Sequence, residues 1–292
     1  MMNSISLRWS RSVKRLGCLV LLLFVIAEGW LVVGVRVGGE PPIVREYVVE
    51  SEKIATPVRI VMLSDLHGCE HPTIAAQIEA LEPDLILFVG DMINHYHETG
   101  EDILVTAALT RELCKLAPVY YALGNHERER VDLHDHNALD LILQAGAILL
   151  DQSFTDLNIR GNEIRLGGLY TTADVVYAEE SENTQKEFLV EFCDTDSYRI
   201  LMEHRPASYW DILYVIGYEP DLVVSGHLHG GHVILPIIGP VFGANSGVLP
   251  EYSLGRYELG ASTFIVSAGL STERHIVPRI NNPTEITFIV LE

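Results

Sequence analysis

The feature that most constrains this chain is a set of short apolar runs that each end in polar side chains. The runs "VRIVMLS" (58–64), "DLILFVG" (84–90) and "PVYYALG" (118–124) have the length and composition of buried strands. In an α/β protein, the loops beyond the carboxyl ends of neighbouring strands meet at one edge of the sheet. We therefore expect one site to collect the polar residues that follow five such segments: Asp65, His67, Asp91, Asn125, His126, His204, His227 and His229.

A regular alternation of strand and helix patterns places these segments in one fold. Amphipathic stretches with helical spacing occupy residues 73–82, 103–116 and 136–146. The second half holds more strand-like segments, among them "FTDLNIRG", "NEIRLGGLY", "YRILMEHRP", "DLVVSG", "STFIVSAG" and "EITFIVLE". This order predicts an α/β (α+β) protein in which two sheets pack face to face and helices lie outside them.

The residue types in the expected site are those of transition-metal ligands. A single histidine beside an apolar strand is more often a core or surface residue, but eight polar residues at one edge have no such explanation. Imidazoles and carboxylates without thiolates suit divalent ions such as Mn²⁺, Fe²⁺ or Zn²⁺. The four cysteines, at positions 18, 69, 114 and 193, have the spacing of neither a disulfide framework nor a thiolate zinc site.

The order of the motifs, D-x-H, G-D, G-N-H-E, H and G-H-x-H, resembles that of the calcineurin-like metallophosphoesterase superfamily. The closing "PRINNPTEITFIVLE" and the motif "GHLHGGH" resemble its bacterial membrane-associated phosphodiesterase branch. The resemblance implies a four-layer sandwich of two mixed β-sheets flanked by helices. It also implies dinuclear-metal-dependent hydrolysis of phosphoester bonds, with phosphodiesters as the expected substrates and a hydroxide that bridges the two ions as the nucleophile.

The resemblance also implies roles for individual residues. The first ion would be held by Asp65, His67, Asp91 and His229. The second would be held by Asp91, Asn125, His204 and His227, so that the Asp91 carboxylate bridges the pair. His126 matches the catalytic histidine, which protonates the leaving oxygen or stabilises the charge on the phosphorus centre.

Several positions depart from the family pattern or stay open. Asn94 stands where many relatives carry an aspartate, and we expect its amide to orient His126. His232 replaces a frequent glutamine, and it could touch substrate or lie behind the ligands. Ala268 replaces a larger polar or basic residue. Histidines that flank the motifs, and that could line the pocket or remain solvated, are His95, His97, His134 and His136. Arg205 could meet a phosphate oxygen, but we expect it to pair with a carboxylate.

The N-terminal segment predicts a membrane anchor. Residues 16–35 are apolar apart from Glu28, and the run is long enough to cross a bilayer. The basic residues that precede it should stay cytoplasmic and place the body outside, which predicts a single-pass protein of the cell membrane. A removable signal peptide over residues 1–27 is the alternative. A tether and edge strand over 36–57 and the catalytic domain over 58–292 complete the expected organisation.

The charge of the chain limits its partners. The net charge is −20, and without residues 1–35, which hold four basic residues and one acidic residue, it becomes −23. Such a body repels nucleic acid, so we expect no nucleic-acid binding. The expected partner is a phosphoester substrate, lipid or envelope-derived. Two alternatives are a UDP-2,3-diacylglucosamine-type pyrophosphatase and a non-catalytic scaffold on the same fold.

Overall fold

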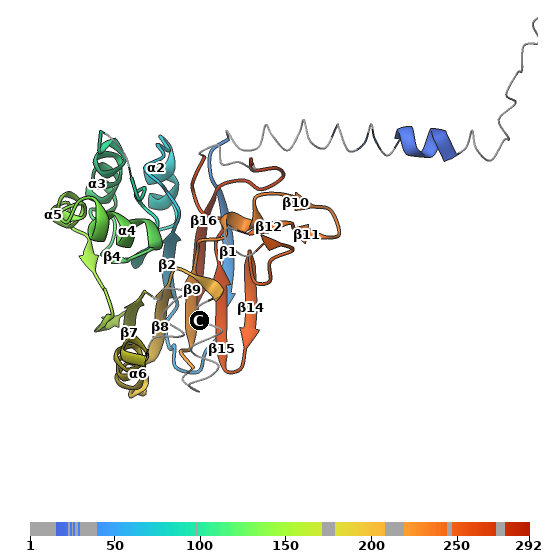
Figure 1. Cartoon of the computed structure of the whole chain (residues 1–292). Helices are drawn as coiled ribbons and strands as arrows, with labels where there is room; N and C mark the ends of the chain where they lie inside the picture. The colour runs from blue at the N-terminus through green and yellow to red at the C-terminus, as the bar shows by residue number, and fades with distance from the viewer. Residues whose placement is uncertain are drawn as a thin grey trace, which may run out of the picture.

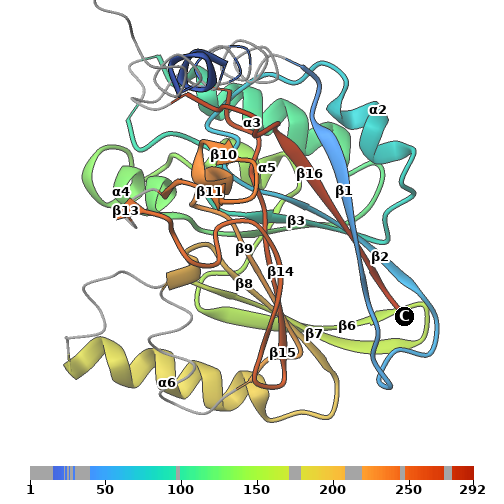
Figure 2. The ribbon, with the colours of Figure 1, turned by 90° about the vertical axis from the view of Figure 1, so that its right-hand side faces the viewer.

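Two six-stranded mixed sheets pack face to face, with helices on both outer sides, in the computed structural model of this chain (Figure 1). The structure describes residues 16–22, 24, 26, 29, 40–96, 99–170, 179–207, 219–243, 247–272 and 278–292. Four layers result, as the resemblance implied. In the view of Figure 2, the strands of the two sheets overlap and run at an angle to each other.

The first sheet has the order β1-β16-β2-β3-β4-β5. Its strands are β1 (Ile43–Val49), β16 (Glu285–Leu291), β2 (Val58–Leu63), β3 (Leu85–Val89), β4 (Val119–Ala122) and β5 (Ile148–Leu149). Strands β2 to β5 run parallel, and β16 runs antiparallel to β2. The first and last strands of the chain therefore pair at one edge, where β1 lies parallel to β16.

The second sheet has the order β14-β15-β9-β8-β7-β6. Its strands are β14 (Gly255–Leu259), β15 (Ser262–Val266), β9 (Leu222–Ser225), β8 (Tyr198–Glu203), β7 (Asn162–Leu169) and β6 (Ser153–Ile159). The inner strands β7, β8, β9 and β15 are parallel, and the two outer strands are antiparallel to their neighbours. The carboxyl ends of the parallel strands carry the predicted site residues.

Helices cover the outer faces of both sheets. Figure 1 shows α2 (Ile74–Glu79), α3 (Glu101–Leu113), α4 (Asn125–Leu133) and α5 (Asp140–Gln144) beside the first sheet and α6 (Glu179–Cys193) beside the second. α2 and α5 fall within the predicted ranges 73–82 and 136–146, while α3 begins two residues before its predicted start. One apolar cluster joins the first sheet to its helices, and another joins the second sheet to α6.

Burial on both faces explains why the central strands read as continuous apolar runs. In β2, Ile60 and Met62 lie in the cluster between the two sheets. Val61 and Leu63 of the same strand face the helices instead. Because side chains alternate along a strand, every residue of such a strand meets a core.

Two short hairpins follow the last site loop and were not predicted from the sequence. β10 (Ile234–Leu235) pairs with β11 (Gly239–Pro240), and β12 (Phe242–Gly243) pairs with β13 (Gly247–Val248). They come directly after the 3₁₀ turn η2 (His229–Gly231).

Half of the predicted membrane segment, residues 23, 25, 27, 28 and 30–35, lies outside the described residues. Within the described part of the chain, no helix has the length and apolar character needed to span a bilayer.

Candidate metal centre

The predicted site residues converge at the carboxyl ends of β2, β3, β4, β8 and β9. Three groups of side chains have ligand atoms close enough to share a metal ion, with all atoms of a group within 4.8 Å of one another. These groups are Asp65, His67 and His229; His67, Asp91 and His126; and Asp91, His204 and His227.

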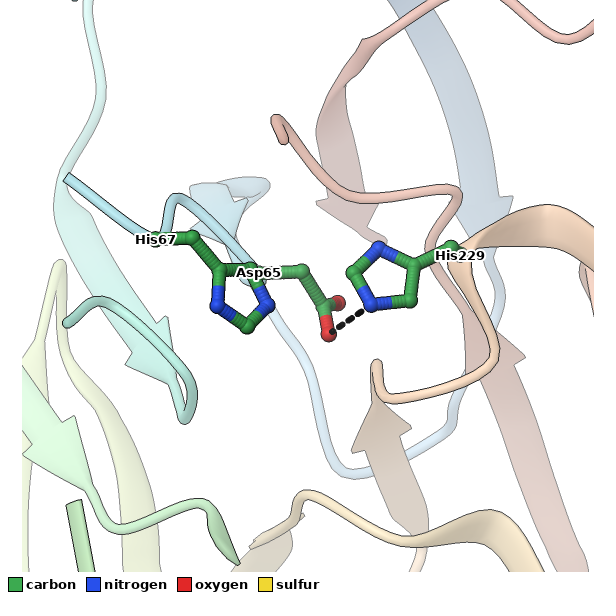
Figure 3. A group of neighbouring side chains, drawn as sticks. All are labelled: Asp65, His67 and His229. Atoms are coloured by element: carbon green, nitrogen blue, oxygen red, sulfur yellow. Dashed lines mark ion pairs between the residues drawn. The ribbon is translucent and has the colours of Figure 1, made fainter. Parts of the chain in front are cut away.

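The first group joins the loop after β2 to the loop after β9. Figure 3 shows the Asp65 carboxylate between the rings of His67 and His229, with Oδ1 3.8 Å from Nε2 of His229. The backbone N–H of His227 donates to both oxygens of Asp65, at 3.0 and 3.1 Å. All of these side chains are buried. The carboxylate thus ties two loops together and presents an oxygen to the cluster.

The other two groups share Asp91, which follows β3. Nε2 of His204 lies 3.0 Å from Oδ2 of Asp91. The same Oδ2 lies 4.0 Å from Nε2 of His67, which belongs to the first group. Nδ1 of His204 is hydrogen-bonded to the carbonyl of Val89 at 2.8 Å, so this ring can present only Nε2 to the cluster. One oxygen of Asp91 therefore lies between His67 and His204.

Asn125 and His126 begin α4 beside the centre. The backbone N–H of His126 donates to Oδ1 of Asp91 at 2.8 Å, and its Nε2 lies 3.9 Å from Oδ2 of Asp91. The backbone N–H of His95 donates to Nδ1 of His126 at 3.1 Å. A neutral His126 ring therefore carries its proton on Nε2, the nitrogen that faces the centre. Arg205 reaches the amide oxygen of Asn125 at 3.5 Å.

Burial and mutual charge set the protonation of these groups. Burial raises the pKa of Asp65 to about 6, against the opposing effect of His204. Burial also acts to raise the pKa of Asp91, but His204 and the other neighbouring histidines outweigh it and hold that pKa well below its usual value. Burial disfavours a charged His204, yet Asp91 and Asp65 raise its pKa to about 10. Burial and the His204 charge lower the pKa of His227 to about 3.

This donor set fits divalent transition ions. Two carboxylates removed from water need compensating positive charge nearby. A neutral imidazole, as at His227, is the form that coordinates a metal. Imidazoles and carboxylates without thiolate are the ligands of Mn²⁺, Fe²⁺ and catalytic Zn²⁺.

The backbone of the centre is held in conformations that most residues avoid. Positive φ angles occur at Asp65 (51°), His67 (50°), Asp91 (53°), His227 (70°) and His229 (47°). Side chains other than glycine rarely adopt this region, and such residues gather at functional sites. Two glycines make the close packing possible, because a Cβ at Gly124 would overlap the Asp91 carboxylate and one at Gly226 would overlap that of Asp65. The loops are shaped around the two carboxylates.

Glu127, the glutamate of the G-N-H-E motif, had no predicted role. Its buried carboxylate accepts hydrogen bonds from the backbone N–H groups of Asp91, Met92, Ile93 and Gly124 and from the Tyr121 hydroxyl, at 2.6 to 3.2 Å. Glu127 thereby fastens the loop after β3 to the start of α4. A glutamate three residues after a glycine that precedes a helix is the available sequence signal.

Asn94 orients His67, which corrects our expectation that it orients His126. The amide oxygen of Asn94 lies 3.0 Å from Nδ1 of His67, and its NH₂ donates to the His67 carbonyl at 3.1 Å. Asp102 accepts the Asn94 backbone N–H at 2.9 Å and forms a buried ion pair with Arg130 at 2.6 Å. His67 therefore directs Nε2 towards the cluster.

The remaining candidates take outer positions. His232 is buried, with its ring centroid 5.2 Å from that of His229. His95 contacts His126, His134 packs on Tyr96, and His136 is exposed. Ala268 is buried and its carbonyl accepts a hydrogen bond from Arg279. His97 lies outside the described residues.

The C-terminal motif supports the last ligand loop from behind. The buried Arg279 donates to the carbonyls of Ala268 and Ser271. Asn282 donates to the carbonyl of His229 at 2.6 Å. "PRINNP" thus packs against the loop that carries His229, although it lies far along the chain.

Comparison with known proteins agrees with the geometry. The calcineurin-like phosphoesterase family matches residues 58–231, which is more than half of the chain. The chain belongs to this family. The match confirms the prediction of a phosphoester hydrolase.

Curated relatives are distant in sequence. A metallophosphoesterase of Caenorhabditis elegans is 26% identical over 275 residues, covering 86% of this chain and 53% of that protein. The metallophosphoesterase YkuE of Bacillus subtilis is 26% identical and covers 80% of this chain and 79% of its own length. Phosphodiesterase YaeI of Escherichia coli is 24% identical, with 81% and 83% covered. The chain thus spans about half the length of the worm relative and about four fifths of the other two.

Proposed function

We propose that this protein hydrolyses phosphodiesters with two divalent metal ions at the membrane surface. The observation that carries the proposal is the place of Asp91, whose Oδ2 lies 3.0 Å from His204 of one ligand group and 4.0 Å from His67 of the other. A single carboxylate that reaches both groups is suited to bridge two ions.

The proposed ligands divide around this carboxylate. Asp65, His67, Asp91 and His229 hold one ion, and Asp91, Asn125, His204 and His227 hold the other. Mn²⁺, Fe²⁺ or Zn²⁺ would suit both sets. When bound, such a pair activates the attacking water and neutralises phosphate charge, which an acidic protein of net charge −20 needs at its site.

His126 serves as the proton donor in this proposal. Its Nε2 faces the cluster, 3.9 Å from Oδ2 of Asp91, and in the protonated ring this nitrogen carries the proton that is donated. The side chain is 22% exposed, whereas that of Asp91 is 2% exposed, so a substrate oxygen can reach it. A general acid placed here protonates the departing alkoxide.

The membrane part of the proposal rests on the N-terminal sequence. An apolar run over 16–35 follows four basic residues, Arg8, Arg11, Lys14 and Arg15, and this order favours a single span with the body outside the cytoplasm. Substrates would then be phosphoesters of the envelope or lipid headgroups. Protease added to intact cells, with any outer envelope opened, should digest the body; digestion only after lysis would reverse the topology and revive the pyrophosphatase alternative.

The metal proposal is tested on the purified full-length chain. Elemental analysis after reconstitution with Mn²⁺ should find up to two ions per chain, together with hydrolysis of a nitrophenyl phosphodiester. Asp91→Asn should remove more metal than any other single ligand change, because it alone serves both ions. Asp132→Asn, at an exposed position of α4, is the matched control. Absence of metal from the reconstituted wild type contradicts the proposal.

A further inference from the structure

The two hairpins after the metal centre expose a set of large apolar side chains. We call this set the hairpin patch, and its members are Leu235, Ile237, Ile238, Phe242, Val248 and Leu249. Ile237 is fully exposed and Val248 is 67% exposed. Soluble monomers seldom gather so many exposed apolar side chains in one short segment, and such a patch marks an interaction surface.

The patch lies in a part of the chain without formal charge. Between Asp221 and Glu251 the sequence contains no Asp, Glu, Lys or Arg, although 21% of the whole chain is charged. The rim of a protein–protein interface is usually polar. An uncharged apolar tip on a strongly acidic body is suited instead to an environment from which charge is excluded.

The patch adjoins the metal centre. η2 contains the candidate ligand His229 and leads directly into β10. A Cβ at Gly231 would overlap Pro240 of β11, so the hairpin packs against the ligand loop. The backbone N–H of Val241 donates to Val233 at 2.9 Å, and that of Leu249 donates to Val241 at 2.7 Å, which joins the two hairpins. What the patch binds is therefore held beside the centre.

We propose that the hairpin patch inserts into the bilayer surface and presents the metal centre to phosphoester headgroups of membrane lipids. This inference rests on the proposed function, because it names the substrate class of the same site. Isoleucine, leucine and phenylalanine side chains that enter the acyl boundary leave water, which favours insertion.

The chain itself favours a bilayer over a protein partner. The predicted span ends at Val35 and β1 begins at Ile43, and the connecting residues 36–42 reach at most about 25 Å when extended. The body is thus held close to the membrane. Figure 1 shows the hairpins extending away from the sheets on the side where β1 and β14 are the edge strands.

The position of the patch is tested by fluorescence quenching. In the full-length chain reconstituted into phosphatidylcholine vesicles, Ile237→Trp should gain emission that lipids brominated in the acyl chain quench. Val190→Trp, on the exposed side of α6 at the opposite end of the molecule, is the control and should not be quenched beyond the parent chain. Equal quenching at both positions overturns the proposal. A blue shift at position 237 that depends on protein concentration in detergent, without vesicles, assigns the patch to a second copy and also overturns it.

The consequence for catalysis is tested with paired substrates. The double change Ile237→Ser and Ile238→Ser should lower hydrolysis of a phosphodiester lipid in the same vesicles on the order of tenfold or more. Hydrolysis of a water-soluble nitrophenyl phosphodiester should stay unchanged, as should both rates for Val190→Ser. Equal rates on the lipid in mutant and wild type contradict the inference. If the wild type cleaves neither ester, the proposed function fails, while the quenching result still decides where the patch lies.

Discussion

Asn94 shows how one amide sets the direction of a candidate metal ligand. Its oxygen lies 3.0 Å from Nδ1 of His67, so that nitrogen carries the proton and Nε2 holds the lone pair. Asp102 and Arg130 in turn hold the Asn94 backbone: Asp102 accepts a hydrogen bond from its N–H, and Arg130 donates one to its carbonyl. Such outer contacts orient the ring and raise the affinity of the ligand for its metal.

Asn94→Ala should therefore lower the binding affinity only of the ion that His67 holds. We expect a loss of about 10–100-fold in the affinity of that ion, as for other outer contacts of metal ligands. The affinity of the ion at His204 and His227 should not change. Calorimetric metal titration resolves the two events, and Asn137→Ala, at an exposed position, is the control. Equal weakening of both ions would mean that Asn94 supports the loops as a whole.

His126→Ala should keep both ions and lose activity selectively. General-acid catalysis is worth about 10²–10⁴-fold in rate, and it matters when the departing oxygen is strongly basic. Alkyl phosphodiesters should lose that factor, whereas nitrophenyl esters, whose leaving group departs unaided, should lose little. The measurement is kcat on both esters at equal metal content. Equal losses on the two esters would show that His126 positions phosphate and donates no proton.

At the element scale, Glu127 fastens the loop after β3 to the start of α4. Its carboxylate accepts hydrogen bonds from four backbone N–H groups and from the Tyr121 hydroxyl, and its side chain is fully buried. In Glu127→Gln an NH₂ group replaces one of the two carboxylate oxygens, and the N–H groups that bonded to that oxygen lose their acceptor. The free energy of unfolding should fall by roughly 3 kcal/mol, the cost of leaving buried donors unsatisfied.

Urea denaturation of the metal-free chain measures this loss without any contribution from ion binding. Glu129→Gln lies two residues further along α4 and is exposed, so its midpoint should match the wild type. An unchanged midpoint for Glu127→Gln would show that the two loops keep their conformation without the Glu127 hydrogen bonds. Metal affinity should fall with stability, since Asp91 is among the residues that Glu127 fixes.

The elements that could be predicted from the sequence are those whose signal is local. β2 and β3 are continuous apolar runs because both faces are buried, and Asp65 and Asp91 stand directly after them. Asn94 pairs with His67, and Asn282 with His229, across long stretches of chain, so no spacing indicates either contact. The hairpins have strands of two residues, too short for any periodicity to appear.

At the scale of the whole molecule, the proposed membrane contact would set two opposing forces against each other. The hairpin patch and the apolar run over 16–35 favour contact with lipid, whereas the remaining body carries a net charge of −23. An anionic leaflet repels acidic groups over about a Debye length, which is about 30 Å at 0.01 M salt and about 3 Å at 1 M. The connecting residues 36–42 reach a comparable distance of about 25 Å. In the proposed anchored arrangement, repulsion at low salt would therefore hold the hairpin patch off the surface.

The rate on a phosphodiester lipid should consequently fall as the anionic lipid content of the vesicles rises at 0.01 M salt, and added salt should restore it. The rate on a soluble nitrophenyl phosphodiester, measured in the same vesicles, should follow neither variable beyond the effect of salt on that ester alone. Neutral phosphatidylcholine vesicles are the control, since their surface exerts no comparable repulsion and the lipid rate there should not rise with salt. A lipid rate that ignores the anionic content at every salt concentration would show that the acidic faces of the body point away from the bilayer.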